Sequence, residues 1–226
     1  MIELSSLSKA YGTFCAVDGI SVTLPRGSTT VIQGPSGSGK STLLRLIAGL
    51  ERPSEGEIRI DGELVSTPSW VRPPGERNVG LVFQETALWP HLTLARNVAF
   101  GLLGRPKDEV ARRVQEILEA MELSALKARY PSQLSGGEAR RVAIARTLVV
   151  NPAYLLLDEP LTHLQLELKL RLLRGIRKQA EVRGVTLVYV SHDIEEARRL
   201  GGRKLRMTGG RLLGDGLPER GSDGDN

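Results

Sequence analysis

The amino-acid sequence predicts an α/β fold: a parallel-sheet core with an N-terminal antiparallel β-subdomain and an inserted α-helical subdomain. Three observations lead to this prediction. Short β-branched or apolar runs, at residues 29–32 and 154–157, have the length of buried strands. A glycine-rich stretch and then a helical pattern follow the first run, as expected where a strand passes into a helix. A long helical pattern separates the two runs.

The composition is that of an ordinary globular protein. The sequence has 226 residues, of which 40% are hydrophobic and 25% charged, enough for one large domain. No apolar run approaches the roughly 20 residues that cross a bilayer, and residues 1–4 lack the basic start of a signal peptide. The single Cys15 excludes an internal disulfide framework and suits a reducing compartment.

The formal net charge of +5 permits nucleic acid, an anionic membrane face or phosphate ligands as partners. Basic residues are scattered over the predicted helices, which favours solvated helix faces over a binding patch. Only 4% of residues are aromatic, which disfavours a platform for stacking bases. We therefore expect no nucleic-acid partner.

The first third of the chain reads as strands and turns. Ile58 and Ile60 alternate with polar residues, and Asp61-Gly62 then predicts a tight hairpin turn. A helix is expected from Lys40, because apolar residues recur after it at helical spacing. Prolines at 68, 73 and 74 indicate a loop before a buried strand at 79–83.

The predicted helical pattern runs from Glu85 to about Val150. It includes an amphipathic helix that Pro106 opens, with apolar residues at three- and four-residue steps up to Met121. We assign residues 1–86 and 151–213 to the α/β core with its β-subdomain, and residues 87–150 to the helical subdomain. The Gly- and Asp-rich segment 214–226 is expected to be a flexible tail.

One stretch carries conflicting signals. Leucines alternate strictly with polar residues over positions 164–172, which is the period of a strand. The residues themselves, Leu, Glu, Lys, Arg and Gln, are good helix formers. We predict a helix here.

A phosphate-binding loop is the strongest motif. The pattern G-x-x-x-x-G-K-[ST] is met by Gly34, Pro35, Ser36, Gly37, Ser38, Gly39, Lys40, Ser41 and Thr42. Glycines let backbone N–H groups wrap a triphosphate, and the following helix directs its positive end at the phosphates. Lys40 is expected to reach the β- and γ-phosphates, and the Ser41 hydroxyl to bind Mg²⁺. Alone, the motif does not separate kinases, GTPases, motors and transporters.

An acidic pair closes the apolar strand at 154–157. Ligands bind at the carboxyl ends of strands in open α/β sheets, so Asp158 is placed to hold Mg²⁺ directly or through water. Glu159 is placed to polarise an attacking water. The alternative, two carboxylates solvated at a strand end, is disfavoured by the apolar strand and the phosphate loop.

A second glycine motif, Leu134-Ser135-Gly136-Gly137-Glu138, precedes a helix. Ser135 followed three residues later by Glu138 is the pattern of a capping box, which is a purely structural reading. A capped helix N-terminus with two glycines is also an anion site, so a contact with a γ-phosphate on a partner subunit is compatible with capping.

In this order along the chain, these motifs resemble the ABC (ATP-binding cassette) ATPases, whose signature reads L-S-G-G-Q. Tyr11 resembles the aromatic residue that stacks on adenine in that family, although ordinary packing is an alternative. Gln84 resembles the Q-loop glutamine, which senses Mg²⁺ and the attacking water. His192 resembles the switch histidine at the γ-phosphate, although a lone histidine after a strand is often structural. The resemblance covers about residues 1–213.

The resemblance implies a P-loop NTPase (RecA-like) core and a head-to-tail homodimer. Each ATP would lie between the Lys40 loop of one subunit and the segment 135–137 of the other. It implies ATP hydrolysis with Mg²⁺, in which Glu159, His192, Gln84 and Lys40 are catalytic. Ser41, Gln84 and Asp158 are the implied metal residues.

The amino-acid sequences of two segments resemble one subgroup of the family, the importers. Residues 77–84 and 88–93 are similar to the subgroup that serves polyamines, sulfate, molybdate, iron, sugars or thiamine. This implies membrane permease subunits, a solute-binding protein and a peripheral place at the cytoplasmic face of the cell membrane. Residues 84–91 are the expected docking surface, with Trp89 either an exposed anchor or packed within the helical subdomain. Many of these importers carry an extra C-terminal β-domain, which we expect to be absent here together with its regulation.

The sequence departs from the family pattern at two places. Glu138 replaces the usual signature glutamine, which we expect to be mild. The loop after the acidic pair usually reads Ser-Ala-Leu-Asp, and here it reads Thr162-His163-Leu164-Gln165. Since that Asp helps the two ATP sites communicate in the family, we expect hydrolysis to survive with altered coupling between the sites.

Three alternatives differ in class. An ABC ATPase of DNA repair or chromosome maintenance would carry long coiled coils, and a ribosome-acting one would carry two cassettes; neither feature is present in this sequence. The third is a regulatory module that binds ATP without hydrolysis. Gln165 supports it, and Glu159 and His192 oppose it.

Overall fold

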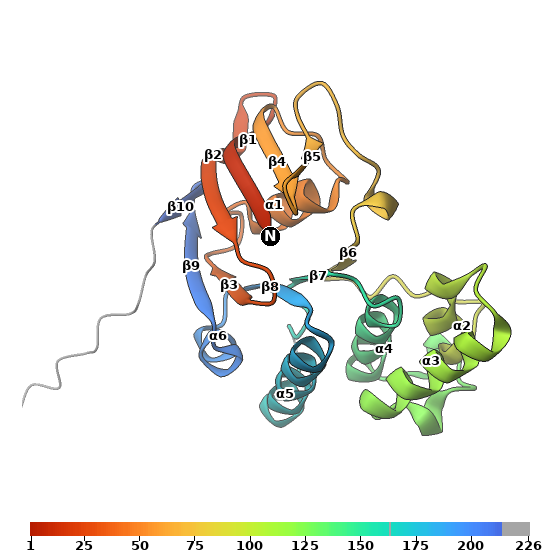
Figure 1. Ribbon diagram of the computed structural model, residues 1–226. Helices are drawn as coiled ribbons and strands as arrows, with labels where there is room; N and C mark the ends of the chain where they lie inside the picture. The colour runs from red at the N-terminus through yellow and green to blue at the C-terminus, as the bar shows by residue number, and fades with distance from the viewer. Residues whose placement is uncertain (163, 214–226) are drawn as a thin grey trace, which may run out of the picture.

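Two β-sheets form the frame of the protein, shown in Figure 1. The computed structural model describes residues 1–162 and 164–213, so the predicted tail 214–226 lies outside the described residues. The first sheet is antiparallel, in the order β2-β1-β4-β5. Its strands are β1 (Ile2–Tyr11), β2 (Phe14–Leu24), β4 (Glu55–Ile60) and β5 (Glu63–Ser66).

The second sheet has six strands in the order β10-β9-β3-β8-β7-β6. Its strands are β3 (Thr29–Gln33), β6 (Val79–Val82), β7 (Tyr154–Asp158), β8 (Thr186–Ser191), β9 (Arg203–Thr208) and β10 (Arg211–Leu213). All neighbours pair in parallel except β10, which is antiparallel to β9. Every residue of β7 and β8 is buried, as expected for central strands covered on both faces.

Helices cover the second sheet. They are α1 (Lys40–Ala48), α2 (Leu94–Ala99), α3 (Lys107–Ala120), α4 (Gly136–Leu148), α5 (Leu166–Arg183) and α6 (Ile194–Leu200), with short 3₁₀ turns at Pro74–Glu76, Phe100–Leu102, Ser124–Leu126 and Pro131–Gln133. In Figure 1, α1 lies between the two sheets, and α2 and α3 stand apart from the strands beside α4. The chain between β6 and β7 thus contributes α2, α3 and α4.

Two apolar cores follow from this layering. Alternate residues of β7 face opposite sides: Leu155 and Leu157 join the core under α2–α6, whereas Tyr154 and Leu156 join the core shared with α1 and the antiparallel sheet. Because both faces of the parallel sheet are covered, its carboxyl edge is the place where polar side chains can gather.

The helix predicted over the alternating leucines is confirmed, since α5 begins at Leu166. Its buried residues are Leu172, Leu173, Ile176 and Ala180, which lie on one helical face. The alternation of leucines with polar residues over 164–172 therefore does not correspond to a strand.

The predicted helical start at Glu85 is wrong by nine residues. The first helix after β6 begins at Leu94, and no residue from 85 to 93 is in a helix or strand. Pro90 interrupts the stretch, and Thr93 caps α2 by accepting a hydrogen bond from the Arg96 N–H at 3.4 Å. By contrast, Pro106 does open a helix, since α3 follows it directly, and the Asp61-Gly62 turn joins β4 to β5 with φ of 51° and 83°.

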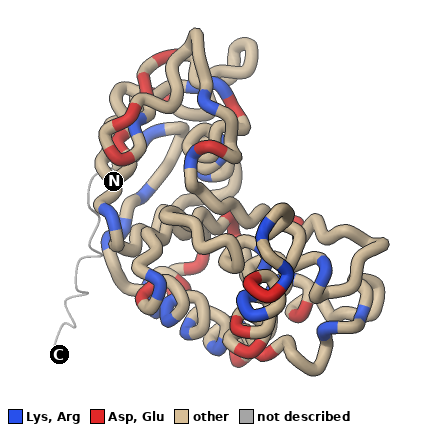
Figure 2. Tube along the Cα trace, turned by 45° about the vertical axis from the view of Figure 1, so that its right-hand side comes forward, with Lys and Arg blue, Asp and Glu red and all other residues tan. Residues whose placement is uncertain are grey.

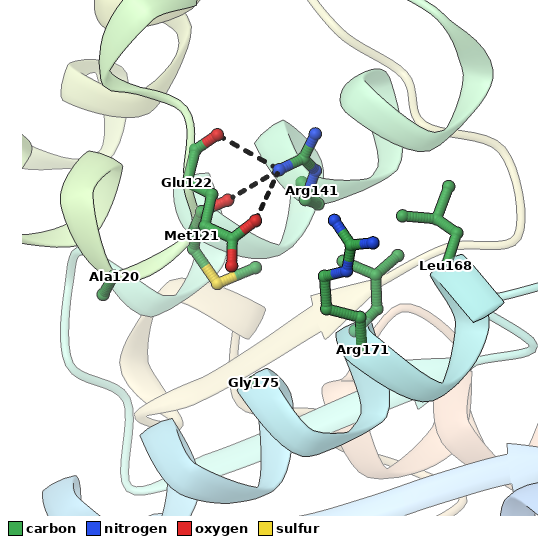
Figure 3. Close-up of a pocket in the computed structure, with 8 residues that line it drawn as sticks. Ala120, Met121, Glu122, Arg141, Leu168, Arg171 and Gly175 are labelled. Atoms are coloured by element: carbon green, nitrogen blue, oxygen red, sulfur yellow. Dashed lines mark hydrogen bonds and ion pairs between the residues drawn. The ribbon is translucent and has the colours of Figure 1, made fainter.

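One arginine of α4 contacts the end of α3. Arg141 of α4 donates from Nη1 to the carbonyls of Met121 and Glu122, each at 3.1 Å, where α3 ends. A cation at a helix C-terminus satisfies carbonyls that lack intrahelical partners. Figure 3 shows this contact beside Leu168 and Arg171 of α5.

Charge is spread over the whole molecule. Figure 2 shows Lys and Arg interspersed with Asp and Glu in both the strand-rich and the helix-rich parts. Among the residues that the structure describes, none of the helices combines the length and apolarity that crossing a membrane requires.

Candidate nucleotide-binding site

The glycine-rich loop joins β3 to α1 and approaches other backbone segments closely. A Cβ on Gly34 would lie 2.1 Å from the Met207 carbonyl oxygen, and one on Gly39 would lie 2.0 Å from the Ala16 carbonyl oxygen. Gly39 also has a φ of 98°, in the region that favours glycine. These two positions therefore require glycine for a steric reason as well as for access to a phosphate.

Lys40 is folded back over its own loop. Its ammonium donates to the carbonyls of Gly34 at 2.9 Å and Pro35 at 2.8 Å, and it lies 3.6 Å from Glu159 Oε1. Only 4% of the side chain is exposed. The partners of this cation are neutral carbonyls, the Ser38 hydroxyl at 3.5 Å and one carboxylate, and an entering phosphate could replace them.

An open hollow lies over the loop, with a volume of about 280 Å³. It is lined by Phe14, Ala16, Ser36, Gly37, Ser38, Gly39, Lys40, Ser41, Thr42, Gln84 and Glu159. The structure thus brings most of the predicted loop to the same hollow as Gln84 and Glu159. Gln84 is far from the loop in the sequence and follows a different strand, β6.

Ser41 and Asp158 lie side by side. The Ser41 hydroxyl donates to Asp158 Oδ1 at 3.0 Å, joining the start of α1 to the end of β7. Burial raises the pKa of Asp158, the neighbouring Glu159 adds to this, and the Ser41 hydrogen bond opposes it. A hydroxyl and a carboxylate oxygen at this spacing match the donors that Mg²⁺ takes from proteins beside substrate phosphates, so these residues fit the ion.

Glu159 has an unusual backbone. Its φ is 44°, in the left-handed region, and its N–H donates to the Val190 carbonyl at 3.1 Å. The side chain lies between two groups, since Oε1 faces Lys40 and Oε2 lies 3.0 Å from His192 Nδ1. A non-glycine residue in this conformation is a strained backbone of the kind that gathers at functional sites. His192 itself is 55% exposed.

Tyr11 does not line the hollow. It is 44% exposed and lies 4.9 Å from Lys9 Nζ, measured to the ring centroid, while burial and then Glu51 raise its pKa. Its partner across the β1–β2 hairpin is Phe14, which is 59% exposed and does line the hollow. Sequence reasoning missed Phe14; the available signal was an aromatic residue three positions after Tyr11, directly after the turn at Gly12-Thr13.

The segment 135–137 is also absent from the residues that line the hollow. It begins α4, and the predicted capping box is present: Ser135 Oγ accepts from the Glu138 N–H at 3.3 Å, and Glu138 Oε2 accepts from the Ser135 N–H at 2.7 Å. Ser135 and Gly136 are exposed. Within one chain, the two glycine motifs therefore remain separate.

A partly buried charge cluster lies next to His192 in the chain and was not predicted. Lys169 of α5 contacts Asp193 Oδ2 and Glu196 Oε1, each at 2.8 Å. Glu196 also accepts hydrogen bonds from the hydroxyls of Tyr189 at 2.9 Å and Ser191 at 2.6 Å. These contacts fix the loop that carries His192 to the first turn of α5. No signal in the amino-acid pattern points to this cluster, because Lys169 resembles the many surface cations of a helix.

Comparison with known proteins identifies the arrangement. The family model described as ABC transporter matches residues 17–162. The sulfate/thiosulfate import ATP-binding protein CysA of Caulobacter vibrioides is 43% identical over 225 residues, covering 97% of this chain and 65% of that protein. The Fe(3+) ions import ATP-binding protein FbpC of Photorhabdus laumondii is 40% identical, covering 96% of this chain and 62% of that protein. The chain thus spans less than two thirds of the length of these relatives.

A solved structure agrees with the fold over nearly the whole chain. The ATP-binding cassette MJ0796, a dimer in a post-hydrolysis state bound to ADP and Pi, has a TM-score of 0.84 and 34% identity. The match covers 94% of this chain and 96% of that one. The predicted fold class, an α/β P-loop NTPase core, is confirmed by this likeness.

Proposed function

Because the chain belongs to the ABC transporter family of ATP-binding cassettes, we propose that it is the ATP-binding, ATP-hydrolysing subunit of an ABC importer. The observation that carries the proposal is the convergence of Lys40, Ser41, Asp158, Glu159 and His192. These residues come from three separate segments, yet a chain of contacts of 3.6 Å or less joins Lys40 to His192 through Glu159. A phosphate loop, a pair of residues suited to a metal ion and a carboxylate suited to activating water, lying together, are the parts that phosphoryl transfer to water requires.

The reaction is the in-line attack of water on the γ-phosphate of ATP. The loop N–H groups and the positive end of α1 bind the β- and γ-phosphates, and Lys40 leaves its own carbonyls to offset their charge. Glu159 orients and polarises the water, while His192 and Gln84 contact the γ-phosphate side. Ser41, Gln84 and Asp158 would hold Mg²⁺, which supplies further charge neutralisation when bound.

The adenine requires an aromatic surface near the loop. Tyr11 is assigned to stacking on the base, and Phe14 adds a second exposed ring at the same hairpin. Base–aromatic stacking is worth about 1–3 kcal/mol in other proteins, so either ring could contribute measurably to ATP affinity.

The working unit is a head-to-tail homodimer. Ser135, Gly136 and Gly137 do not line the hollow of their own chain, and the segment is proposed to meet the γ-phosphate held by a second copy. Ser135 and Gly136 lie exposed at a helix N-terminus, which is suited to an anion. ATP bound between two copies favours the closed dimer, and hydrolysis removes that bridge.

The membrane partner is a pair of permease subunits, served by a solute-binding protein, with this chain peripheral at the cytoplasmic face. The docking surface is the irregular segment 84–91. Trp89 is 42% exposed there, and its ring lies 5.3 Å from that of Phe100 and 6.1 Å from that of His91, measured between centroids. It is therefore both packed and partly open, and an aromatic residue in this state suits an interface anchor.

The proposal is tested by light scattering of the Glu159→Gln chain with ATP and Mg²⁺. We expect a dimer with ATP, a monomer with ADP, and a monomer with ATP when Ser135→Arg is added. The proposal is contradicted if the Glu159→Gln chain stays monomeric at saturating ATP. It is also contradicted if the chain still dimerises with ATP after Ser135→Arg is added. A phosphate-release assay of the unmodified chain separates it from a module that binds ATP without hydrolysing it.

A further inference from the structure

Arg140 joins three segments that are far apart in the sequence. It lies in the second turn of α4, and its Nη1 donates to the Gln84 carbonyl and to the Pro160 carbonyl, each at 3.0 Å. Its Nη2 donates to the Thr162 hydroxyl at 3.2 Å. One guanidinium thus holds α4, the segment after β6 and the loop after Glu159.

Arg140 is a cation whose three hydrogen-bond acceptors carry no charge. All three of these acceptors are neutral, and burial lowers the pKa of the guanidinium. Desolvating a cation without a carboxylate partner is unfavourable unless its donors are well satisfied. The planar fork of arginine satisfies acceptors in fixed directions, which lysine cannot do, so the contact defines the relative position of the three segments.

A hydrogen-bond chain leads from Arg140 to the backbone of Glu159. The Thr162 hydroxyl accepts from Arg140 and donates to the Glu159 carbonyl at 3.2 Å. Glu159 needs such support because its left-handed φ is unfavourable for a residue with a side chain. A shift of Arg140 would therefore move the backbone that carries the water-activating carboxylate.

Ser135 is the N-cap of α4, close to Arg140. Arg140 follows it by five residues, a rise of about 7.5 Å along the helix, and the capping box makes this first part of α4 well defined. In the head-to-tail dimer, Ser135 contacts the ATP held by the second copy, whereas Gln84 and Glu159 act on the ATP held by their own chain. Arg140 lies between these two sets of contacts.

We propose that Arg140 is a positioning residue that couples the two ATP sites: it transmits the engagement of Ser135 at one site to Gln84 and Glu159 at the other. This inference rests on the proposed function. It gives a physical route for communication in a chain whose loop carries Gln165 where the family usually has Asp.

Neighbouring arginines of α4 do not offer this route. Arg141 instead contacts the carbonyls of Met121 and Glu122 at the end of α3 (Figure 3). Arg146 donates to the Ala87 carbonyl at 2.9 Å and lies 3.5 Å from the Thr86 carbonyl. Arg146 thus contacts the segment after β6 as Arg140 does, and its pKa is also lowered by burial. Because Arg146 contacts the segment after β6 but, among the described residues, not the loop after Glu159, Arg146→Met is a matched control for Arg140→Met.

The experiment measures phosphate release against ATP concentration for the unmodified chain, Arg140→Met, Thr162→Val and Arg146→Met. Melting temperature and the affinity for a nonhydrolysable ATP analogue are measured on the same samples. The Hill coefficient cannot exceed the number of coupled sites. We expect it to lie above 1 in the unmodified chain and in Arg146→Met, and to fall to about 1 in Arg140→Met with unchanged analogue affinity. Thr162→Val, which keeps the shape of the side chain, should show the same loss to a smaller extent.

The inference is overturned if Arg140→Met and Thr162→Val keep the cooperativity of the parent, if Arg146→Met loses as much as Arg140→Met, or if the unmodified chain shows no cooperativity. Light scattering with Glu159→Gln added separates this failure from failure of the proposed function. If the ATP-dependent dimer forms but cooperativity is unchanged in the Arg140 variants, only the role of Arg140 is rejected. If no variant forms an ATP-dependent dimer, the shared ATP site itself is rejected.

Discussion

His192 Nδ1 lies 3.0 Å from Glu159 Oε2, so the residue assigned to the γ-phosphate and the residue assigned to the attacking water contact each other directly. The other oxygen of Glu159 faces Lys40 at 3.6 Å. Glu159 is thus at the centre of the site, between a buried cation and an exposed imidazole. ATP has to enter this arrangement by taking over the contacts of Lys40.

Glu159→Gln should bind ATP and hydrolyse it at least about 100-fold more slowly, since a positioned general base contributes 10²–10⁴-fold in other enzymes. The amide keeps the shape of the side chain and loses its basicity. Phosphate release and ATP retention on a filter measure the two effects separately. Phosphate release close to that of the parent, from a preparation free of other ATPases, contradicts the assigned role.

Glu138 should stabilise the start of α4 in a pH-dependent way. The Ser135 N–H lowers the pKa of the Glu138 carboxyl, so its contribution is present above the unfolded pKa of about 4.3 and is lost as pH falls through the lower folded value. Glu138→Gln keeps the reach of a capping box and removes the charge, so we expect a loss of about 0.3–1 kcal/mol at neutral pH. Denaturation at pH 7 and pH 3 measures it, with the exposed Glu85→Gln as control. A loss that is equal at both pH values contradicts this.

Gln165→Asp should stabilise α5. Gln165 has N-cap geometry, with φ −60° and ψ 144°, and its side chain makes no capping hydrogen bond. An Asp there can accept from the first-turn N–H groups, a gain of about 1 kcal/mol. We expect the same substitution to change the hydrolysis rate or its cooperativity, because the charge returns to the loop between the sites.

Gln165→Asn is the matched control, since it caps without a charge. Melting temperature and the Hill coefficient are measured for both variants. If Gln165→Asp has the rate and cooperativity of the parent, the hypothesis of altered coupling is wrong.

Lys169→Met should destabilise the fold by about 3 kcal/mol, because it leaves Asp193 and the buried Glu196 without their cation. It should also lower hydrolysis, since the cluster fixes the loop of His192 to α5. Lys178→Met, an exposed position of the same helix, should change stability by no more than about 0.5 kcal/mol. Urea denaturation of the two variants makes the comparison, and equal stabilities would show that the cluster contributes nothing.

The phosphate loop and the acidic pair could be predicted because each depends on neighbours in the chain. The glycine pattern of the loop and the position of Asp158 at a strand end follow from local sequence and from strand patterns. The close approach of Gly34 to Met207 and of Gly39 to Ala16 depends on the tertiary fold and was not predicted. The helix at 166–183 was also within reach, since helix propensity outweighed a misleading alternation of leucines.

The contacts of Arg140 and Lys169 could not be predicted in the same way. Arg140 contacts Gln84, 56 residues earlier, and Thr162, 22 residues later. Each of these pairs depends on how strands of the parallel sheet are ordered. The order of the strands cannot be predicted from the sequence alone. A cation on a predicted helix does not indicate which distant residue it contacts.

The central claim is that one ATP is shared between the Lys40 loop of one copy and the Ser135 segment of another. It is tested most directly by mixing two inactive chains, Lys40→Ala and Ser135→Arg, each with Glu159→Gln added so that bound ATP is retained. A mixed dimer then has one intact site, formed by Lys40 of one chain and Ser135 of the other. The account predicts that neither chain alone retains ATP and that the mixture retains one ATP per dimer; a mixture that retains none contradicts it.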